Sequence, residues 1–301
     1  MTAQYILSRG TAGLGALILV MSVVPGNTDA TQKMKPSELV GRHLASIGTP
    51  EARAAVRNRA ASGAATVLLT PAPKIQNTIL VPPKQDNRTE AGASADQKRS
   101  GNAVFISAGE SVRLSLNFSA SDYGGEDLAY DGKKLRPHVY GRLSVPVELI
   151  SEGLLGGTLT TTWALLDHTK RRPRLEYRGL KKLAGREYHE LQYLFRKDYG
   201  NRHVVDIRAL MYFDPQTFRH IKTECRILDV AGSGKGTSMR THTLTEEFAD
   251  FSVADGLTLP RIYKLRYSSE SNRHTTTTEW NVTFSEIRHN QQLDRNAFVL
   301  K

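Results

Sequence analysis

Residues 111–120, SVRLSLNFSA, decide the fold class, because apolar and polar side chains alternate along them without interruption. The apolar members are Val112, Leu114, Leu116 and Phe118. Successive side chains of a strand point to opposite faces of a sheet, so a period of two predicts a strand with one buried face. This stretch therefore predicts a half-buried β-strand, and the rest of the chain can be compared with it.

The same period returns repeatedly towards the C-terminus. Residues 221–227, IKTECRI, alternate in the same way, and aromatic residues alternate around 263–267 and 280–284. Turn signals such as Asp214-Pro215 and Asp255-Gly256 separate these segments, and the hairpin signal Asp131-Gly132 lies upstream. Strands spaced by about 10–15 residues, with helices mainly near the N-terminus, predict an antiparallel α+β fold.

Two helices are expected before the first strand. Residues 35–48 place Leu39, Val40, His43, Leu44 and Ile47 on one face, and Gly48 ends the segment. Thr49-Pro50-Glu51 then has the residues of a helix start: an N-cap, a first-turn proline and an acid near the dipole. A lone histidine on an apolar face is more often packed than ligating, so His43 is predicted to be a core residue. The strand 60–70 follows, and Pro146 opens a further helical turn that Gly156-Gly157 closes.

The first thirty residues have the pattern of a secretory signal peptide. Arg9 precedes the uncharged apolar run 12–24, and Thr28-Asp29-Ala30 places small side chains before a cut after Ala30. The apolar run is too short for a spanning helix, which needs about 20 residues. We therefore expect an exported protein, periplasmic or extracellular, with residues 31–301 as a single domain that is not integral to a membrane after cleavage.

Composition narrows the partners. Forty-one Lys and Arg against thirty Asp and Glu give a net charge of +11, and Cys225 is the single cysteine. One cysteine excludes an intramolecular disulfide and a cysteine-rich zinc cluster. An exported protein rarely meets nucleic acid, so an acidic component of the cell envelope is the more suitable charged partner, and solvated basic residues on strand faces remain the simplest alternative.

A long insertion is expected between the first strands. Residues 71–100 contain Pro71, Pro73, Pro82 and Pro83 and then a polar, alanine-rich run. Prolines remove donors from a sheet, and such a composition buries too little apolar surface to order itself. The sequence predicts a disordered, Pro/Ala-rich insertion over about 71–100.

No motif predicts catalysis, a metal site or a cofactor. The run 231–237, AGSGKGT, lacks the first glycine of a phosphate loop and the hydroxyl directly after its lysine, so it is predicted to be a hairpin turn. His-Glu-x-x-His and Gly-x-Ser-x-Gly do not occur. Cys225 lies on the apolar phase of a strand, where an inert buried thiol is expected.

Two groups of residues are candidates for binding. Aromatic and aliphatic side chains on the strands predict either an apolar groove or a closed core, and both alternatives remain open. These groove candidates are Phe105, Leu116, Phe118, Tyr177, Tyr193, Phe195, Tyr263, Tyr267, Trp280 and Phe284. A basic run before a strand either forms a rim for anionic groups or is a solvated loop. The rim candidates are Lys170, Arg171, Arg172 and Arg174.

Taken in order, several short motifs resemble one family. They are His43-Leu44-x-x-Ile47-Gly48, a strand containing Gly63, Gly153-Leu154-Leu155-Gly156-Gly157, Tyr177-x-Gly179 with Gly185-Arg186, Tyr212-Phe213-Asp214-Pro215-x-Thr217, Asp250-Phe251, Asp255-Gly256-Leu257-x-Leu259-Pro260 and Asn290-x-x-Leu293-Asp294-x-x-x-Phe298. Over roughly residues 35–301 the chain resembles the LolA/LolB-like superfamily, the periplasmic carriers of outer-membrane lipoproteins and their relatives. The resemblance implies a strongly curved antiparallel sheet, an incomplete β-barrel, with a few short helices covering the open side.

The expected function is non-catalytic binding. The resemblance implies an exported carrier with a hydrophobic groove for acyl chains or lipidated proteins, which needs no cofactor. The alternative is an envelope sensor or assembly protein that binds a protein partner through the same fold. A hydrolase has the least support, because it would need polar residues converging in a cleft.

Overall fold

A computed structural model describes residues 34–70, 97–120, 123–137, 142–166, 168–171, 173–200, 203–233, 236–270, 275–294 and 296–300. All of them belong to one compact unit, Met34–Lys301. The expected signal peptide lies outside the described residues, as does most of the expected insertion. The last four residues of that insertion, 97–100, belong to a strand.

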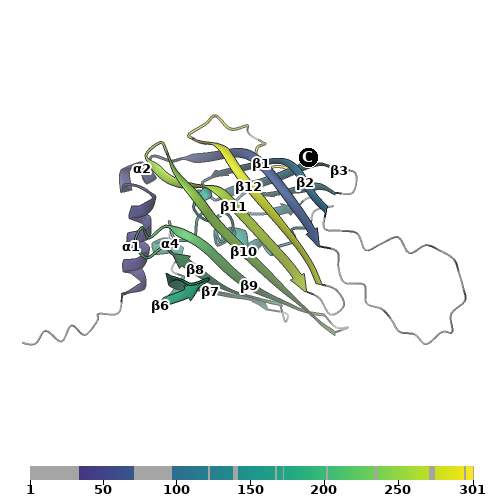
Figure 1. Cartoon of the computed structure of the whole chain (residues 1–301). Coiled ribbons are helices and arrows are strands. Elements are labelled where there is room, and N and C mark those ends of the chain that lie inside the picture. Colours follow the sequence, from purple (N-terminus) through teal and green to yellow (C-terminus); the bar gives the residue numbers. More distant parts are fainter. Residues whose placement is uncertain are drawn as a thin grey trace, which may run out of the picture. The chain divides into compact units, whose positions relative to one another are not determined.

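The described chain is mostly strand, with short helices at two places (Figure 1). The helices are α1 (Pro36–Ile47), α2 (Pro50–Ala54), α3 (Val147–Ser151), the 3₁₀ turn η1 (Gly157–Leu159) and α4 (His168–Arg171). The strands are β1 (Asn58–Thr70), β2 (Gln97–Ala108), β3 (Ser111–Ala120), β4 (Tyr123–Tyr130), β5 (Leu135–Pro137), β6 (Arg174–Leu183), β7 (Arg186–Gly200), β8 (His203–Phe213), β9 (His220–Ser233), β10 (Gly236–Ala254), β11 (Leu257–Glu270) and β12 (Thr275–His289).

The described strands form one antiparallel sheet in the order β5-β4-β3-β2-β1-β12-β11-β10-β9-β8-β7-β6. Strands that are consecutive in sequence pair with each other, except β5 and β6, which are the two edges of the sheet. Strand β1 pairs with β2 on one side and with β12 on the other. The sheet is therefore two meanders joined by the pairing of β1 with β12. Its edges do not meet, so it is not closed.

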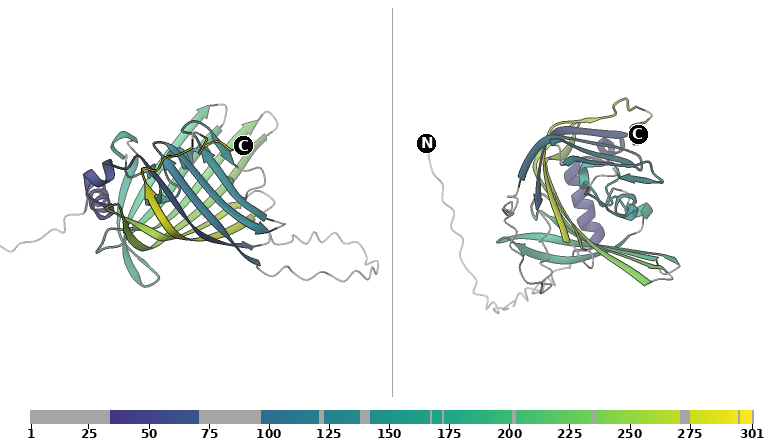
Figure 2. Two further views of the ribbon diagram at one scale, coloured as in Figure 1. Left: turned by 90° about the horizontal axis from the view of Figure 1, so that it is seen from above. Right: turned by 90° about the vertical axis from the view of Figure 1, so that its right-hand side faces the viewer.

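Glycines and bulges allow the sheet to curve. The register between β1 and β12 shifts at Ser62/Gly63, and a Cβ on Gly63 would lie 2.1 Å from the carbonyl oxygen of Thr283. Only glycine permits such a close approach of two strands. Bulges bend a sheet and increase its twist, and Figure 2 shows the curled sheet, with α1 at one end of it and the shorter helical turns on its inner side.

The predicted helices and hairpins are present. Helix α1 buries Leu39, Val40, His43 and Ile47, and the Thr49 side chain accepts a hydrogen bond from the Ala52 backbone N–H at 3.2 Å. Helix α2 ends at Ala54, three residues before Arg57, where the sequence suggests that it ends. Asp255 and Gly256 both have positive φ angles, 49° and 77°, as a tight two-residue hairpin requires.

Two other local predictions, the hairpin at 231–237 and the buried thiol of Cys225, are confirmed. The run 231–237 joins two antiparallel strands, with Ser233 paired to Gly236. Cys225 is buried, and burial raises the pKa of its thiol. Among the described residues, no helix is long and apolar enough to span a membrane.

Candidate functional site

The concave face of the sheet is covered by residues 142–166, which we call the plug segment. It contains α3 and η1, and every residue from Gly153 to Thr160 is buried. Its leucines, from Leu149 to Leu165, and Trp163 belong to one apolar cluster with the strands. This cluster is the main core of the unit.

All ten groove candidates lie in or against this core. Eight are buried, with at most 5% of the side chain exposed, whereas Tyr177 and Phe195 are partly buried and pack against the cluster. The buried eight are Phe105, Leu116, Phe118, Tyr193, Tyr263, Tyr267, Trp280 and Phe284. The sequence left open whether these residues line an apolar groove or form a closed core. In this conformation they form a core, because the plug segment covers the apolar face.

Side chains of the sheet hold the start of the plug segment through its backbone. The Glu126 carboxylate on β4 accepts the backbone N–H groups of Arg142 and Leu143 at 2.8 and 2.9 Å. The Tyr267 hydroxyl on β11 donates to the carbonyl of Ser144. Tyr199 on β7 donates to the side-chain carboxylate of Glu148 in α3. These contacts satisfy polar groups of a segment that has little regular structure of its own.

The second half of the plug segment is held in the same manner. Ser107 on β2 accepts the backbone N–H of Thr161 at 2.8 Å. His43 on α1 accepts the indole N–H of Trp163 at 3.1 Å. The Trp163 ring also stacks on His220 of β9, with centroids 4.7 Å apart.

The tightest part of the plug segment is the turn Gly156-Gly157-Thr158. The Gly156 backbone N–H and the Tyr263 hydroxyl both donate to Oε1 of Glu246, each at 2.6 Å. A Cβ on Gly157 would lie 2.7 Å from the Phe248 ring and 3.2 Å from Nδ1 of His220. The turn therefore lies directly on buried polar groups of β9 and β10.

Three buried polar atoms at this turn have no hydrogen-bond partner within the described part of the chain. They are Oγ1 of Thr158, Nδ1 of His220 and Oε2 of Glu246. An unsatisfied buried polar group costs about 1–3 kcal/mol. The free energy of packing this turn against the sheet is thus less favourable than its apolar contacts alone would make it.

Burial controls the charge of this cluster. It raises the pKa of Glu246 to about 7, against the lowering effect of the bonds from Tyr263 and Gly156. Burial also lowers the pKa of His43 to about 4. The pKa of His220 lies well below its usual value because of burial and the proximity of His43. The histidines are therefore neutral at pH 7.

Two of the basic rim candidates, Arg171 and Arg174, have described side chains, and both have partners within the chain. Arg174 is exposed and forms an ion pair with Glu176 of its own strand at 2.8 Å. Arg171 donates to the carbonyl of Ser151 and so holds the plug segment. Arg172 and the side chain of Lys170 lie outside the described residues.

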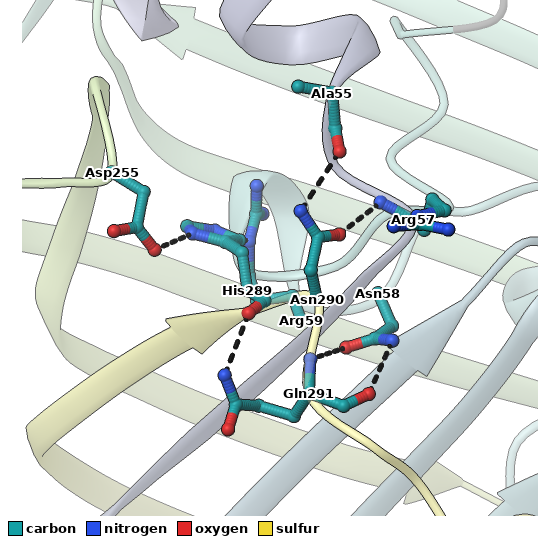
Figure 3. Close-up of polar contacts among 8 residues, drawn as sticks. All are labelled: Ala55, Arg57, Asn58, Arg59, Asp255, His289, Asn290 and Gln291. Carbon is teal, nitrogen blue, oxygen red and sulfur yellow. Dashed lines mark hydrogen bonds and ion pairs between the residues drawn. The ribbon is translucent and has the colours of Figure 1, made fainter.

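Arg59 is the most buried cation that sequence reasoning missed. It is on β1 and only 4% exposed. Its Nε donates to Nε2 of His289 at 2.9 Å, and its Nη1 donates to the carbonyl of Thr158. Nδ1 of His289 in turn donates to Asp255 at 2.9 Å. Figure 3 shows these side chains beside Asn290 and Gln291, which pair with the start of β1.

Within the described ranges, no three His, Cys, Asp or Glu side chains gather in a group that could hold a metal ion. His43, His220 and Glu246 are all buried, and each contacts the plug segment, through Trp163 or Gly156.

Comparisons with known proteins give only distant likenesses. No protein-family model matches the chain, and no curated protein matches it. One similar solved structure is a putative outer membrane lipoprotein-sorting protein domain from Vibrio parahaemolyticus, at 12% identity and a TM-score of 0.38, covering 88% of this chain and 97% of that one.

Two further structures contain MucB. One is the Pseudomonas aeruginosa MucA/MucB complex, at 9% identity and a TM-score of 0.20, covering 85% of this chain and 99% of the other. The second is MucB with MucA(peri), at 10% identity and a TM-score of 0.19, covering 86% and 100%. The chain is thus similar, at low TM-scores, to a lipoprotein-sorting domain and to MucB.

Proposed function

We propose that the protein is an exported, non-catalytic binding protein that takes up an acyl chain, free or attached to a protein, on the concave face of its sheet. The plug segment would move aside to admit it. One observation carries this proposal: a continuous apolar face of the sheet is covered by a segment that has little regular structure of its own.

The energetics of the covered face support an exchange of occupants. Apolar surface withdrawn from water contributes about 25 cal/mol per Å² whether its cover is the plug segment or an acyl chain. The three unsatisfied polar atoms, on Thr158, His220 and Glu246, destabilise the covered state. When the turn leaves, water can reach these groups, which offsets part of the cost of opening.

The test is acyl binding by the purified full chain. Native mass spectrometry of protein isolated gently from its source, and titration with a fluorescent fatty acid, should both detect bound acyl chain. If the protein shows no bound lipid and does not bind the probe, the proposal is contradicted. A protein complex found by crosslinking under those conditions would support the alternative, an envelope protein that binds a protein partner.

A plug variant makes the test specific. Ser107→Ala removes the acceptor for the Thr161 N–H. If this costs the closed state about 1 kcal/mol, the open population and the apparent acyl affinity rise about fivefold. Ser285→Ala is the matched control, since that hydroxyl contacts Ser62 on exposed strand surface. Equal affinities in both variants would show that opening the plug segment does not limit binding.

A further inference from the structure

A small pocket lies where α1, α2 and β1 meet the end of the plug segment. Its volume is about 60 Å³, and one water-sized group needs about 10–15 Å³. The pocket therefore has room for about four to six such groups. Its apolar wall comes from Ile47, Val56, Leu166 and Leu257, and its polar wall from Arg53, Arg59, Thr158 and Thr161.

The polar wall carries positive charge without a carboxylate. Arg53 and Arg59 both line the pocket, whereas no Asp or Glu is among the described residues that line it. The recorded partners of Arg59 within the described chain are neutral: a ring nitrogen of His289 and the carbonyl of Thr158. Arg53 likewise donates to the carbonyls of Leu44 and Gly48.

A buried guanidinium normally has an anionic partner, because burying an unpaired charge is expensive. The nearest compensation for Arg59 is indirect, through His289 to Asp255, whose side chain is 68% exposed. Burial lowers the pKa of Arg59 to about 10, with the result that it remains charged at neutral pH. The cation is therefore buried, charged and without direct neutralisation among the described residues.

A second, independent observation points to a ligand in the same place. Thr158 is 4% exposed and lines the pocket, yet its hydroxyl has no hydrogen-bond partner within the described part of the chain. The two hydrogen bonds of Arg59 to described residues use Nε and Nη1, not Nη2. An acceptor-rich group placed in the pocket would satisfy both. Guanidinium groups suit phosphate oxygens in particular.

We infer that this pocket binds a tetrahedral oxyanion of the phosphate class, as free phosphate or as a phosphate ester headgroup. Arg59, Arg53 and the Thr158 hydroxyl bind the oxygens, and the four oxygens fill the available volume. Because Thr158 belongs to η1, the bound oxyanion also fastens the plug segment to β1. The oxyanion site does not depend on the proposed acyl binding, and the two are measured separately.

The experiment is calorimetric titration of the full chain, purified without phosphate, with inorganic phosphate. Saturable binding and a rise in melting temperature with phosphate concentration are expected, since a ligand that binds only the folded state stabilises it. Sodium acetate is the planar comparison and should bind more weakly. No saturable binding at millimolar phosphate, or equal binding of acetate, would overturn the assignment.

Variants distinguish the site from non-specific attraction to a basic protein. Arg53→Gln and Thr158→Val should each weaken phosphate binding about tenfold, the effect of losing one hydrogen bond to a charged group. Thr158→Val keeps the carbonyl that Arg59 needs and removes only the unsatisfied hydroxyl, so it should fold as well as the parent or better. Arg57→Gln is the matched control, because Arg57 is exposed two residues away and does not line the pocket.

The variants also decide the matter if Arg59→Gln fails to fold. Unchanged affinity in both Arg53→Gln and Thr158→Val would overturn the proposal, as would an equal loss in Arg57→Gln. Soluble dihexanoyl phosphatidic acid separates the two sources of the oxyanion: tighter binding than phosphate identifies a lipid headgroup, and equal binding identifies free phosphate. Acyl binding without phosphate binding would reject this inference alone.

Discussion

The backbone N–H of Gly156 donates to Oε1 of Glu246 at 2.6 Å, which joins the plug segment to the centre of the sheet through a buried carboxyl group. The same oxygen accepts the Tyr263 hydroxyl, and Glu246 is fully buried. Burial raises the pKa of this carboxyl to about 7, because its effect exceeds the lowering effect of the two hydrogen bonds. The contact therefore has consequences for stability as a function of pH.

The first prediction concerns Glu246. Between about pH 4.5 and pH 7 the unfolded chain loses this proton while the folded chain keeps it. The Glu246 contribution to the free energy of unfolding thus falls as pH rises through this window, by on the order of 3 kcal/mol. Urea unfolding across this range should show that slope in the difference between the free energies of unfolding of the parent and Glu246→Gln. Glu247→Gln, at an exposed neighbouring position, should keep the slope.

The second prediction concerns His43 and has the opposite sign. Burial, opposed by the hydrogen bond to the Phe218 carbonyl and helped by the nearby Arg53, holds the pKa of His43 at about 4, whereas the unfolded histidine titrates near 6.5. As pH falls from about 6.5 to about 4, His43 of the unfolded chain binds a proton while that of the folded chain stays neutral. The free energy of unfolding therefore drops by on the order of 3 kcal/mol.

The measurement for His43 is again the difference between parent and variant. His43→Gln should lack this acid-side loss, whereas His168→Gln, on α4 outside the core, should retain it. Because the Glu246 and His43 contributions oppose each other between about pH 4.5 and 6.5, the parent's own pH curve is flattened there. Identical parent and His43→Gln slopes would show that this histidine accepts a proton without leaving its place.

Period and turn chemistry were sufficient to predict the sheet. The alternation at Val112–Phe118 lies within β3, and the Asp255-Gly256 turn joins β10 to β11. These features depend on residues close together in sequence. The pairing of β1 with β12, in contrast, joins Val67 to Trp280, and a single sequence does not specify a contact at that separation.

The candidate site was only partly predictable. The residues around Leu149 and Leu154 read as a short helical turn, but nothing local says which face of the sheet they cover. Glu246 did leave a signal, because Leu244-x-Glu246-x-Phe248 places a carboxyl on the apolar phase of a strand. Arg59 has the same phase as buried Ala61. A charged residue in the inward phase was the sign that a polar group lies within the core.

The third prediction tests how firmly the plug segment is packed. Leu154 is fully buried between η1 and the sheet cluster. Leu154→Ala should lower the free energy of unfolding by about 2–5 kcal/mol, since it removes apolar burial and leaves a cavity. Leu180→Ala, on the edge strand β6 where the side chain is 50% exposed, should change it by less than about 0.5 kcal/mol. A small loss at Leu154 would mean that the plug segment is absent from the cooperative core.

The last prediction separates backbone conformation from packing in the same segment. Gly153 has a φ of +68°, and a Cβ there would lie 1.8 Å from the carbonyl oxygen of Thr162. Gly153→Ala should therefore cost well over about 1 kcal/mol, through both positive φ and displacement of the backbone at Thr162. Gly41 is the matched control, because it lies inside α1 with nothing within 4 Å of its Cβ position. Gly41→Ala should stabilise the protein by about 0.5–1 kcal/mol, the gain in helix propensity. Chemical denaturation of both variants measures the two signs, and a neutral Gly153→Ala would show that the turn before Gly156 relaxes without cost, which would also make the plug segment the easiest part of the core to displace.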